Sequence, residues 1–277
     1  MDKIGFVILT WNSQNCIGAC LESIAELKDI AYGIVIADNG STDSTIDIIN
    51  RNFVHLSEND NCGLLETIRY ESNMGTTIGR NAGIRKFDNT YNYICILDSD
   101  TIINEDAMKA MIAVLASDNS NGIAGPQMRT KSGILQNSGR KIPTLRLKLI
   151  KALSFFGSKD MGAELERYPD INDQPVHPVG YLMSACWMIK RDVINKVGML
   201  DEKIFYAPED VEYCIRIWLG GYRVLYCNDA HIIHEWQRLS KKKLFSKHNF
   251  EHIKGLMYMF NKYRFWFNAD KIEQLVH

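Results

Sequence analysis

The chain has 277 residues, of which 46% are hydrophobic and 23% charged, with a formal net charge of −1. This composition supports a full hydrophobic core and is typical of a soluble globular protein. No run of 18 or more apolar residues is present, and the N-terminus lacks the layout of a signal peptide, so we expect neither a spanning helix nor a secreted protein.

Strands and helices alternate in the first half of the chain. Each predicted strand is a short apolar run, and each is followed by a segment with helical spacing of apolar residues. Ser41 or Thr42 is expected to cap the second helix, through about Asn50, and Asn104 the helix after the third strand. This alternation predicts a mostly parallel sheet flanked by helices. The expected strands are Ile4–Thr10, Ile34–Ala37 and Tyr93–Leu97.

The second half of the chain has a different pattern. Gly122–Ser138 combines glycine, proline and alternating polarity, which predicts a hairpin rather than a strand–helix–strand unit. We also expect strands at Val179–Ile189, Arg223–Cys227 and His231–His234, a helix at Pro208–Leu219 and a helical tail at Leu244–Phe267.

Cysteine usage indicates the compartment. The seven cysteines form no Cys-x-x-Cys pair, and Cys95, Cys186 and Cys214 lie within apolar runs. Buried, reduced thiols of this kind are typical of cytoplasmic proteins.

Polar clusters follow the predicted strands of the first half. Thr10 and Asn12 end the first strand, Asp38 the second, and Asp98 and Asp100 the third. Ligands of an open parallel sheet bind beyond the carboxyl ends of its strands, so these clusters indicate a common site. Two carboxylates at a strand end suit Mg²⁺ or Mn²⁺, completed by water and diphosphate oxygens. The alternative is an acidic turn that only caps the next helix.

A series of motifs resembles the family 2 glycosyltransferases in order and spacing. The resemblance extends from Ile4 to about Tyr263 and is closest in pattern to the rhamnosyltransferase and galactofuranosyltransferase branches. It implies a GT-A fold with a Rossmann-like, mostly parallel central sheet, a divalent metal and inversion at the anomeric carbon. The motifs are Val7–Asn12, Asp38–Thr45, Asn73–Gly75, Gly79–Ile84, Leu97–Thr101, Ala207–Arg216 and His234–Glu235.

The resemblance assigns the donor side of the site. Thr10 and Asn12 would line the nucleoside pocket, and Asp38 would accept a hydrogen bond from the base or the ribose. Asn73 and Arg80 would contact the diphosphate or ribose. The metal ligands would be Asp98, Asp100 and His234, with Asp98 also facing the donor.

The acceptor side falls on the Ala207–Arg216 motif. A single displacement needs one carboxylate to take the proton of the acceptor hydroxyl, and the second acid of the pair, Asp210, resembles this base. Glu209 and Glu212 would bind the acceptor, and Trp187 is a candidate for stacking on a sugar face, although large aromatics in strands are usually core.

The expected reaction is transfer of a sugar from a UDP-, dTDP- or GDP-sugar to a hydroxyl, in the synthesis of a polysaccharide or lipid-linked glycan. Two alternatives remain: a nucleotidyltransferase that acts on sugar phosphates, and a non-catalytic nucleotide-sugar-binding module. The first would need a Gly-rich, basic loop after the first strand, where this chain has Thr10–Ser13. The intact acids and histidine argue against the second.

Charge is unevenly distributed. Residues 238–267 carry eight Lys or Arg and one acid, a net charge of +7, which leaves −8 for the remainder. We expect a GT-A domain at 1–237, with a nucleotide-sugar half at 1–120 and an acceptor half at 121–237, and a basic aromatic tail at 238–277 packed on it. The tail and Arg140–Lys151 suggest peripheral contact with an anionic membrane at its inner face. No nucleic-acid partner is expected.

Overall fold

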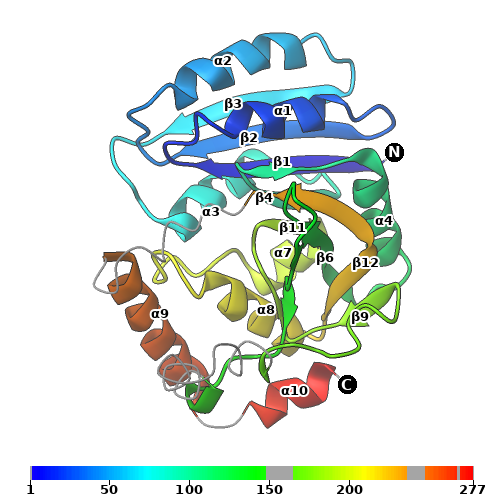
Figure 1. Ribbon diagram of the computed structural model, residues 1–277, viewed down its shortest axis with the longest axis vertical. Helices are drawn as coiled ribbons and strands as arrows, with labels where there is room; N and C mark the ends of the chain where they lie inside the picture. The colour runs from blue at the N-terminus through cyan, green and yellow to red at the C-terminus, as the bar shows by residue number, and fades with distance from the viewer. Residues whose placement is uncertain (1, 148–164, 236–246, 267–268, 277) are drawn as a thin grey trace.

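The computed structural model describes residues 2–147, 165–235, 247–266 and 269–276 (Figure 1). Its centre is a ten-stranded mixed sheet in the order β3-β2-β1-β4-β11-β6-β12-β5, with β7 beside β6 and β9 beside β12, while β8 and β10 pair separately. The strands are β1 Lys3–Thr10, β2 Ala31–Asp38, β3 Cys62–Arg69, β4 Tyr93–Asp98, β5 Thr101–Ile102, β6 Asn121–Arg129, β7 Leu135–Gln136, β8 Gly139–Arg140, β9 Val176–Pro178, β10 Tyr181–Leu182, β11 Cys186–Lys190 and β12 Arg223–His234.

Helices cover both faces of this sheet (Figure 1). Within the described residues they are α1 Ile17–Ala25, α2 Thr45–Leu56, α3 Thr76–Lys86, α4 Glu105–Ala116, α7 Arg191–Val197, α8 Glu209–Leu219, α9 Lys247–Tyr263 and α10 Asp270–Val276.

The alternation of side chains along β1 divides the core into two layers. Ile4, Phe6 and Ile8 are buried in one hydrophobic cluster with residues of α1, α2 and α4, whereas Val7 points the other way. Val7 belongs to the second cluster, with residues of α3, α7, α8, α9 and α10. A strand reverses its side chains at each residue, so a continuous apolar run fills both layers.

The predicted α/β fold is confirmed. β1 pairs in parallel with both β2 and β4, and β2 with β3, so the N-terminal half is a parallel sheet. The strand β3 was not predicted. It is an edge strand whose residues are all half-buried or exposed, and its sequence, Cys62–Arg69, therefore lacks the apolar run of the inner strands.

The predicted hairpin at Gly122–Ser138 is confirmed by the antiparallel pair β6 and β7. The predicted strand at Val179–Ile189 is instead divided into β10 and β11 by Met183–Ala185. The two short strands predicted at 223–227 and 231–234 form one strand, β12, whose register against β6 shifts between Cys227 and His231. A bulge of this kind bends a strand without ending it.

One helix cap was predicted correctly and one was not. The Asn104 side chain accepts a hydrogen bond from the Ala107 N–H, which caps α4 as expected. The helix α2 begins at Thr45, beyond Ser41 and Thr42, because those residues belong to the turn after β2.

Two glycines let α3 lie directly on the sheet. A Cβ at Gly83 would come within 2.5 Å of the Val7 Cγ1 atom, and one at Gly79 would overlap the Leu9 side chain. These glycines therefore serve close packing between helix and sheet, and α3 reaches the carboxyl end of β1.

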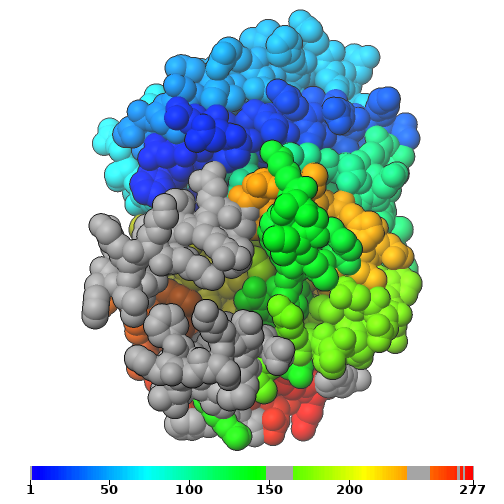
Figure 2. Space-filling view, viewed as in Figure 1, coloured from blue at the N-terminus to red at the C-terminus, as the bar shows by residue number. Residues whose placement is uncertain are grey.

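The last helices lie at the opposite end of the molecule from the first strands (Figures 1 and 2). Met259 and Phe260 of α9 and Ile272 of α10 are buried in the same cluster as α8. Among the helices of the described residues, none combines the length and the apolar character that crossing a membrane requires. The domain boundary expected at residue 237 stays a prediction.

Candidate active site

A pocket of about 380 Å³ opens at the carboxyl ends of β1 and β4. The two strands are parallel, so the residues that follow them meet at one edge of the sheet, as the sequence predicted. The loop before α8 and the end of β12 supply the opposite wall. The whole pocket is lined by residues 9–13, 16, 39, 73, 75, 76, 80, 98–100, 183–185, 205–207, 209, 210 and 234.

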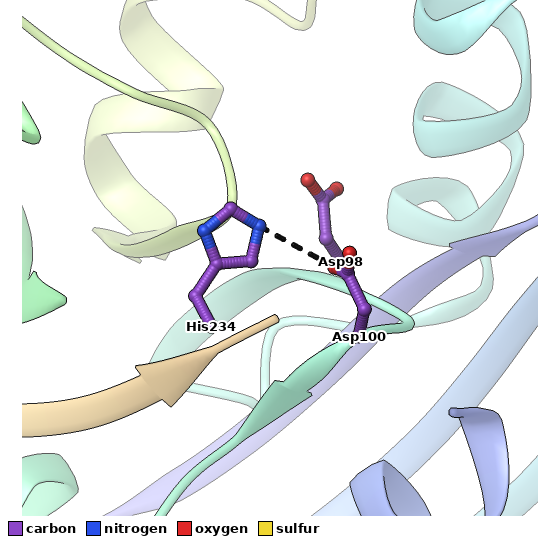
Figure 3. Close-up of side chains that lie close together, drawn as sticks. All are labelled: Asp98, Asp100 and His234. Carbon is purple, nitrogen blue, oxygen red and sulfur yellow. Dashed lines mark ion pairs between the residues drawn. The ribbon is translucent and has the colours of Figure 1, made fainter. Parts of the chain in front are cut away.

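Two carboxylates and an imidazole converge in this pocket. One side-chain ligand atom from each of Asp98, Asp100 and His234 lies within 4.8 Å of the other two. In Figure 3 the His234 ring, at the end of β12, points toward Asp98, the last residue of β4, and Asp100, two residues beyond it. The His234 Nε2 atom is 3.4 Å from the Asp100 Oδ1 atom. Two hard oxygen ligands and one nitrogen fit a divalent cation, so the residues satisfy the chemistry of the predicted metal site.

Gln136, which was not predicted from the sequence, orients the His234 ring through the nitrogen that faces away from Asp100. The Nδ1 atom of the ring lies 2.7 Å from the Gln136 Oε1 atom, and Gln136 donates its side-chain N–H to the His234 carbonyl. With Nδ1–H bonded to the amide oxygen, the Nε2 atom faces Asp100 and is available to coordinate a metal. Burial lowers the pKa of His234, but the adjacent Asp100 carboxylate outweighs it and raises the pKa above its ordinary value.

Arg80 of α3 joins two carboxylates from opposite walls of the pocket. Its Nη2 atom is 2.8 Å from the Asp98 Oδ1 atom, and its Nη1 atom is 3.0 Å from the Glu209 Oε1 atom. The side chain is almost fully buried, which the sequence did not predict for a charged helix residue. The guanidinium, which presents several donors in one plane, therefore ties the metal site to the first residue of α8.

The acids at the start of α8 differ in environment. Glu209 is buried and accepts hydrogen bonds from Arg80 and from the Ser184 hydroxyl at 2.9 Å. Burial and the neighbouring Asp210 charge raise the pKa of Glu209 to about 7. Asp210 is only half-buried and lines the pocket beside it. The more accessible of the two carboxylates is therefore Asp210.

The predicted donor residues lie together at the end of β1. Thr10 is buried at the pocket wall, and within the described residues its hydroxyl has no hydrogen-bond partner. Asn12, with φ of 51°, accepts from the Thr42 N–H and so joins the turns after β1 and β2. Asn73 also lines the pocket and accepts from the Gly75 N–H.

Three predicted site residues are not among the residues that line the pocket. Asp38 is fully buried and accepts hydrogen bonds from the Ser41 N–H and hydroxyl, so it holds the turn after β2. Glu212 is also fully buried, about one turn beyond Glu209 in α8, where Arg216 binds it. Trp187 has no exposed surface and stacks on Tyr213 in the core. The ligand contacts expected of these three residues stay predictions.

Other lining residues went unpredicted. Asn39 follows Asp38 and reaches the pocket in its place, and it donates to the Gly75 carbonyl. Ser184 lies in the break between β10 and β11. The turn sequence around Asn39 was a usable signal, whereas nothing in the sequence marked Ser184 or Gln136.

Three comparisons place this geometry among known proteins. N-acetylglucosaminyl-diphospho-decaprenol L-rhamnosyltransferase of Mycobacterium tuberculosis is 22% identical over 275 residues, which are 97% of this chain and 87% of that protein. The structure of GalNAc-T7 with UDP, GalNAc and Mn²⁺ superposes with a TM-score of 0.69 at 14% identity, over 94% of this chain and 48% of that one. The mannosyltransferase PcManGT from Pyrobaculum calidifontis, with GDP-Man and Mn²⁺, gives a TM-score of 0.65 at 14% identity, over 99% and 68% of the chains.

The family model described as glycosyl transferase family 2 matches residues 6–198, which is more than half of the chain. This range contains most of β1, all of β2 and β4, Arg80 and both candidate metal-binding aspartates. The fold is shared with structures of nucleotide-sugar enzymes. The chain therefore belongs to glycosyl transferase family 2 and is a sugar-transferring enzyme of GT-A fold.

Proposed function

We propose that this chain is an inverting, divalent-metal-dependent glycosyltransferase. It would move a sugar from a nucleoside-diphosphate donor to a hydroxyl of a glycan or lipid-linked glycan. The observation that carries the proposal is the pocket itself. One cavity brings the Asp98, Asp100 and His234 cluster together with the acid pair Glu209 and Asp210 from the other half of the chain.

Asp98, Asp100 and His234 would hold the metal. When bound, Mg²⁺ or Mn²⁺ supplies positive charge that stabilises the departing diphosphate. Support comes from the donor set and from Gln136, which aims the coordinating nitrogen at the aspartates. Related structures such as GalNAc-T7 and PcManGT contain Mn²⁺.

The donor nucleotide would lie along the end of β1. Thr10 and Asn12 would contact the nucleoside, which is supported by the position of both residues in the pocket lining. Asn73 would face the ribose or diphosphate from the loop before α3. UDP and GDP-Man in the neighbouring structures support a nucleoside-diphosphate sugar, and the M. tuberculosis relative supports a rhamnose-like sugar.

Asp210 would act as the general base. Its carboxylate takes the proton of the acceptor hydroxyl while the acceptor oxygen bonds to the anomeric carbon. The bond from that carbon to the diphosphate oxygen breaks, and the nucleoside diphosphate leaves with the electron pair. Glu209 suits this role less well, because its side chain is buried and its Oε1 atom accepts from both Arg80 and Ser184, whereas Asp210 is half-buried and more accessible. It would instead position the acceptor.

The tail supports a place of action at a membrane surface. The helix α9 exposes Phe250, Ile253 and Met257, with Lys254 beside them, on one face. The basic residues Arg238 and Lys241–Lys243 precede this helix but lie outside the described residues, as does part of Arg140–Lys151. Apolar and basic groups on one helix suit the surface of an anionic membrane. The relative named for a decaprenol-linked substrate supports a lipid-linked acceptor.

Replacement of one metal ligand tests the proposal. Asp100→Ala should reduce turnover at least 100-fold and remove the Mn²⁺-dependent rise in thermal midpoint with a nucleotide-sugar, since an ionised ligand is lost. The measurement is a screen of UDP-, dTDP- and GDP-sugars by thermal shift, followed by turnover with and without EDTA.

Asp60→Ala, an exposed acid outside the pocket, is the matched control and should behave as wild type. In the same assay Asp210→Asn should keep donor binding while kcat falls by about 10²–10⁴. Full activity in EDTA or in Asp100→Ala would overturn the metal assignment. Donor binding without turnover in wild type would favour the non-catalytic module.

A further inference from the structure

The segment that leads into the acid pair is a loop, residues 199–208, between α7 and α8. Phe205, Tyr206 and Ala207 of this loop line the pocket, and Glu209 and Asp210 follow directly. The loop contains no strand or helix that would fix its path. Whatever holds the 199–208 loop therefore also sets where Asp210 lies.

One side of the loop is held by α3. The Thr76 N–H donates to the Phe205 carbonyl at 2.6 Å, and the Thr77 hydroxyl donates to the Ile204 carbonyl at 2.7 Å. This anchor belongs to the helix that also carries Arg80, so it ties the loop to the donor half of the molecule.

The other side is held by α9. The Tyr258 hydroxyl donates to the Asp201 carboxylate at 2.8 Å, and the Lys262 ammonium lies 2.6 Å from the same Oδ2 atom. Lys262 also reaches the Glu212 Oε1 atom at 2.7 Å, so one ammonium joins α9 to the loop and to α8. Burial raises the pKa of Asp201, but these donors outweigh it and hold the pKa below its ordinary value.

The closest contact is made by a glycine. A Cβ at Gly255, inside the 17-residue helix α9, would overlap the Ala207 carbonyl oxygen and lie 2.9 Å from the Pro208 Cδ atom. Glycine inside a helix normally lowers its stability, so its presence here needs a packing reason. The contact with Ala207 supplies it, because α9 rests on the loop backbone two residues before Glu209.

We propose that α9 is a positioning element for the acceptor side of the active site. Gly255 packs on the backbone of the 199–208 loop, and Tyr258 and Lys262 bind its Asp201 carboxylate, on the side opposite α3. These contacts thereby place Asp210 against the acceptor hydroxyl. The inference rests on the proposed function for the role of Asp210. It adds that residues outside the family-matched range 6–198 determine the geometry of that step.

Gly255→Ala tests this role, with Gly18→Ala as the matched control. A Cβ at Gly18, in α1, would meet the Ile48 Cγ2 atom at 3.5 Å, an ordinary contact. We expect Gly255→Ala to lower kcat at least tenfold and raise the acceptor KM, with donor affinity within twofold of wild type. Gly18→Ala should leave all three unchanged. A merely structural loss would instead reduce the active fraction without changing either KM.

Tyr258→Phe keeps the experiment decisive if Gly255→Ala does not fold. This substitution removes the hydroxyl that donates to the Asp201 carboxylate. It should lower kcat two- to fivefold and raise the acceptor KM, with donor affinity unchanged. Hydrogen exchange of the 199–208 peptide should rise at least threefold in either variant, with the β4 peptide unchanged, whether or not turnover is detected. Absent turnover in wild type would count against the proposed function alone. Unchanged kcat and loop exchange in the folded variants would overturn the role of α9.

Discussion

Two glutamates on α8, three residues apart, show how the same residue type serves different ends within one turn of a helix. Glu209 lines the pocket and accepts hydrogen bonds from Arg80 and Ser184. Glu212 accepts hydrogen bonds from Arg216 of α8 and from Lys262 and the Tyr263 hydroxyl of α9. Both are buried, so burial alone does not separate a pocket acid from a structural one. The donors do separate them: Arg80 and Ser184 line the pocket, whereas Arg216, Lys262 and Tyr263 do not.

The largest effect is expected on the tail face. Glu212→Gln should lower the free energy of unfolding by about 2–4 kcal/mol, because it leaves two cations without their buried carboxylate. Urea denaturation measures this, and thermal shift with a nucleotide-sugar and Mn²⁺ should still report donor binding. Lost donor affinity with unchanged stability would place Glu212 in the active site and contradict the distinction between Glu209 and Glu212.

The pocket face should respond to pH. The pKa of Glu209 is about 7 in the folded protein against 4.5 ordinarily, so the native state binds this proton more tightly than the unfolded state. Stability from this group is therefore lost as pH rises from about 4.5 through 7. As pH rises through that window, the free energy of unfolding of Glu209→Gln should increase by about 1–3 kcal/mol relative to wild type. Urea denaturation at several pH values measures this difference. A difference that does not vary with pH would contradict the raised pKa.

The smallest effect for each residue changed concerns the tail and the outer face of α9. Replacing Phe250 and Ile253 by serine should weaken binding to anionic vesicles. Replacing Lys241, Lys242 and Lys243 by glutamine should also weaken it, by about 1 kcal/mol for each basic charge near the surface. Sedimentation with vesicles at low and high salt measures it. Stability should not change, since Phe250 and Ile253 are mostly exposed. Equal binding to neutral and anionic vesicles would show that the tail only completes the fold.

Local sequence was sufficient for the elements that depend on local patterns. The apolar runs of β1, β2 and β4, the Asn104 cap and the polar residues at strand ends were all readable, because each depends on neighbours in the chain. Their convergence followed from the rule that parallel strands end at one edge.

Contacts between distant segments were not readable. The burial of Arg80 depends on Glu209, and the orientation of His234 depends on Gln136. Neither the burial of Arg80 nor the orientation of His234 can be predicted from sequence before the arrangement of the strands is known. The motif carrying Glu209 and Asp210 also contains Glu212, and spacing along the chain did not show that α8 turns this acid away from the pocket.

The contact of Gly255 with Ala207 has a consequence for protein engineering. A protein shortened after residue 237 would retain every proposed metal, donor and base residue and still lose the support of the 199–208 loop. Exchange of tails between related enzymes faces the same restriction, since any graft must present a residue without a Cβ at this point. The exposed side of α9 is free of this restriction, so the proposed membrane contact can be altered there without changing the support of the 199–208 loop.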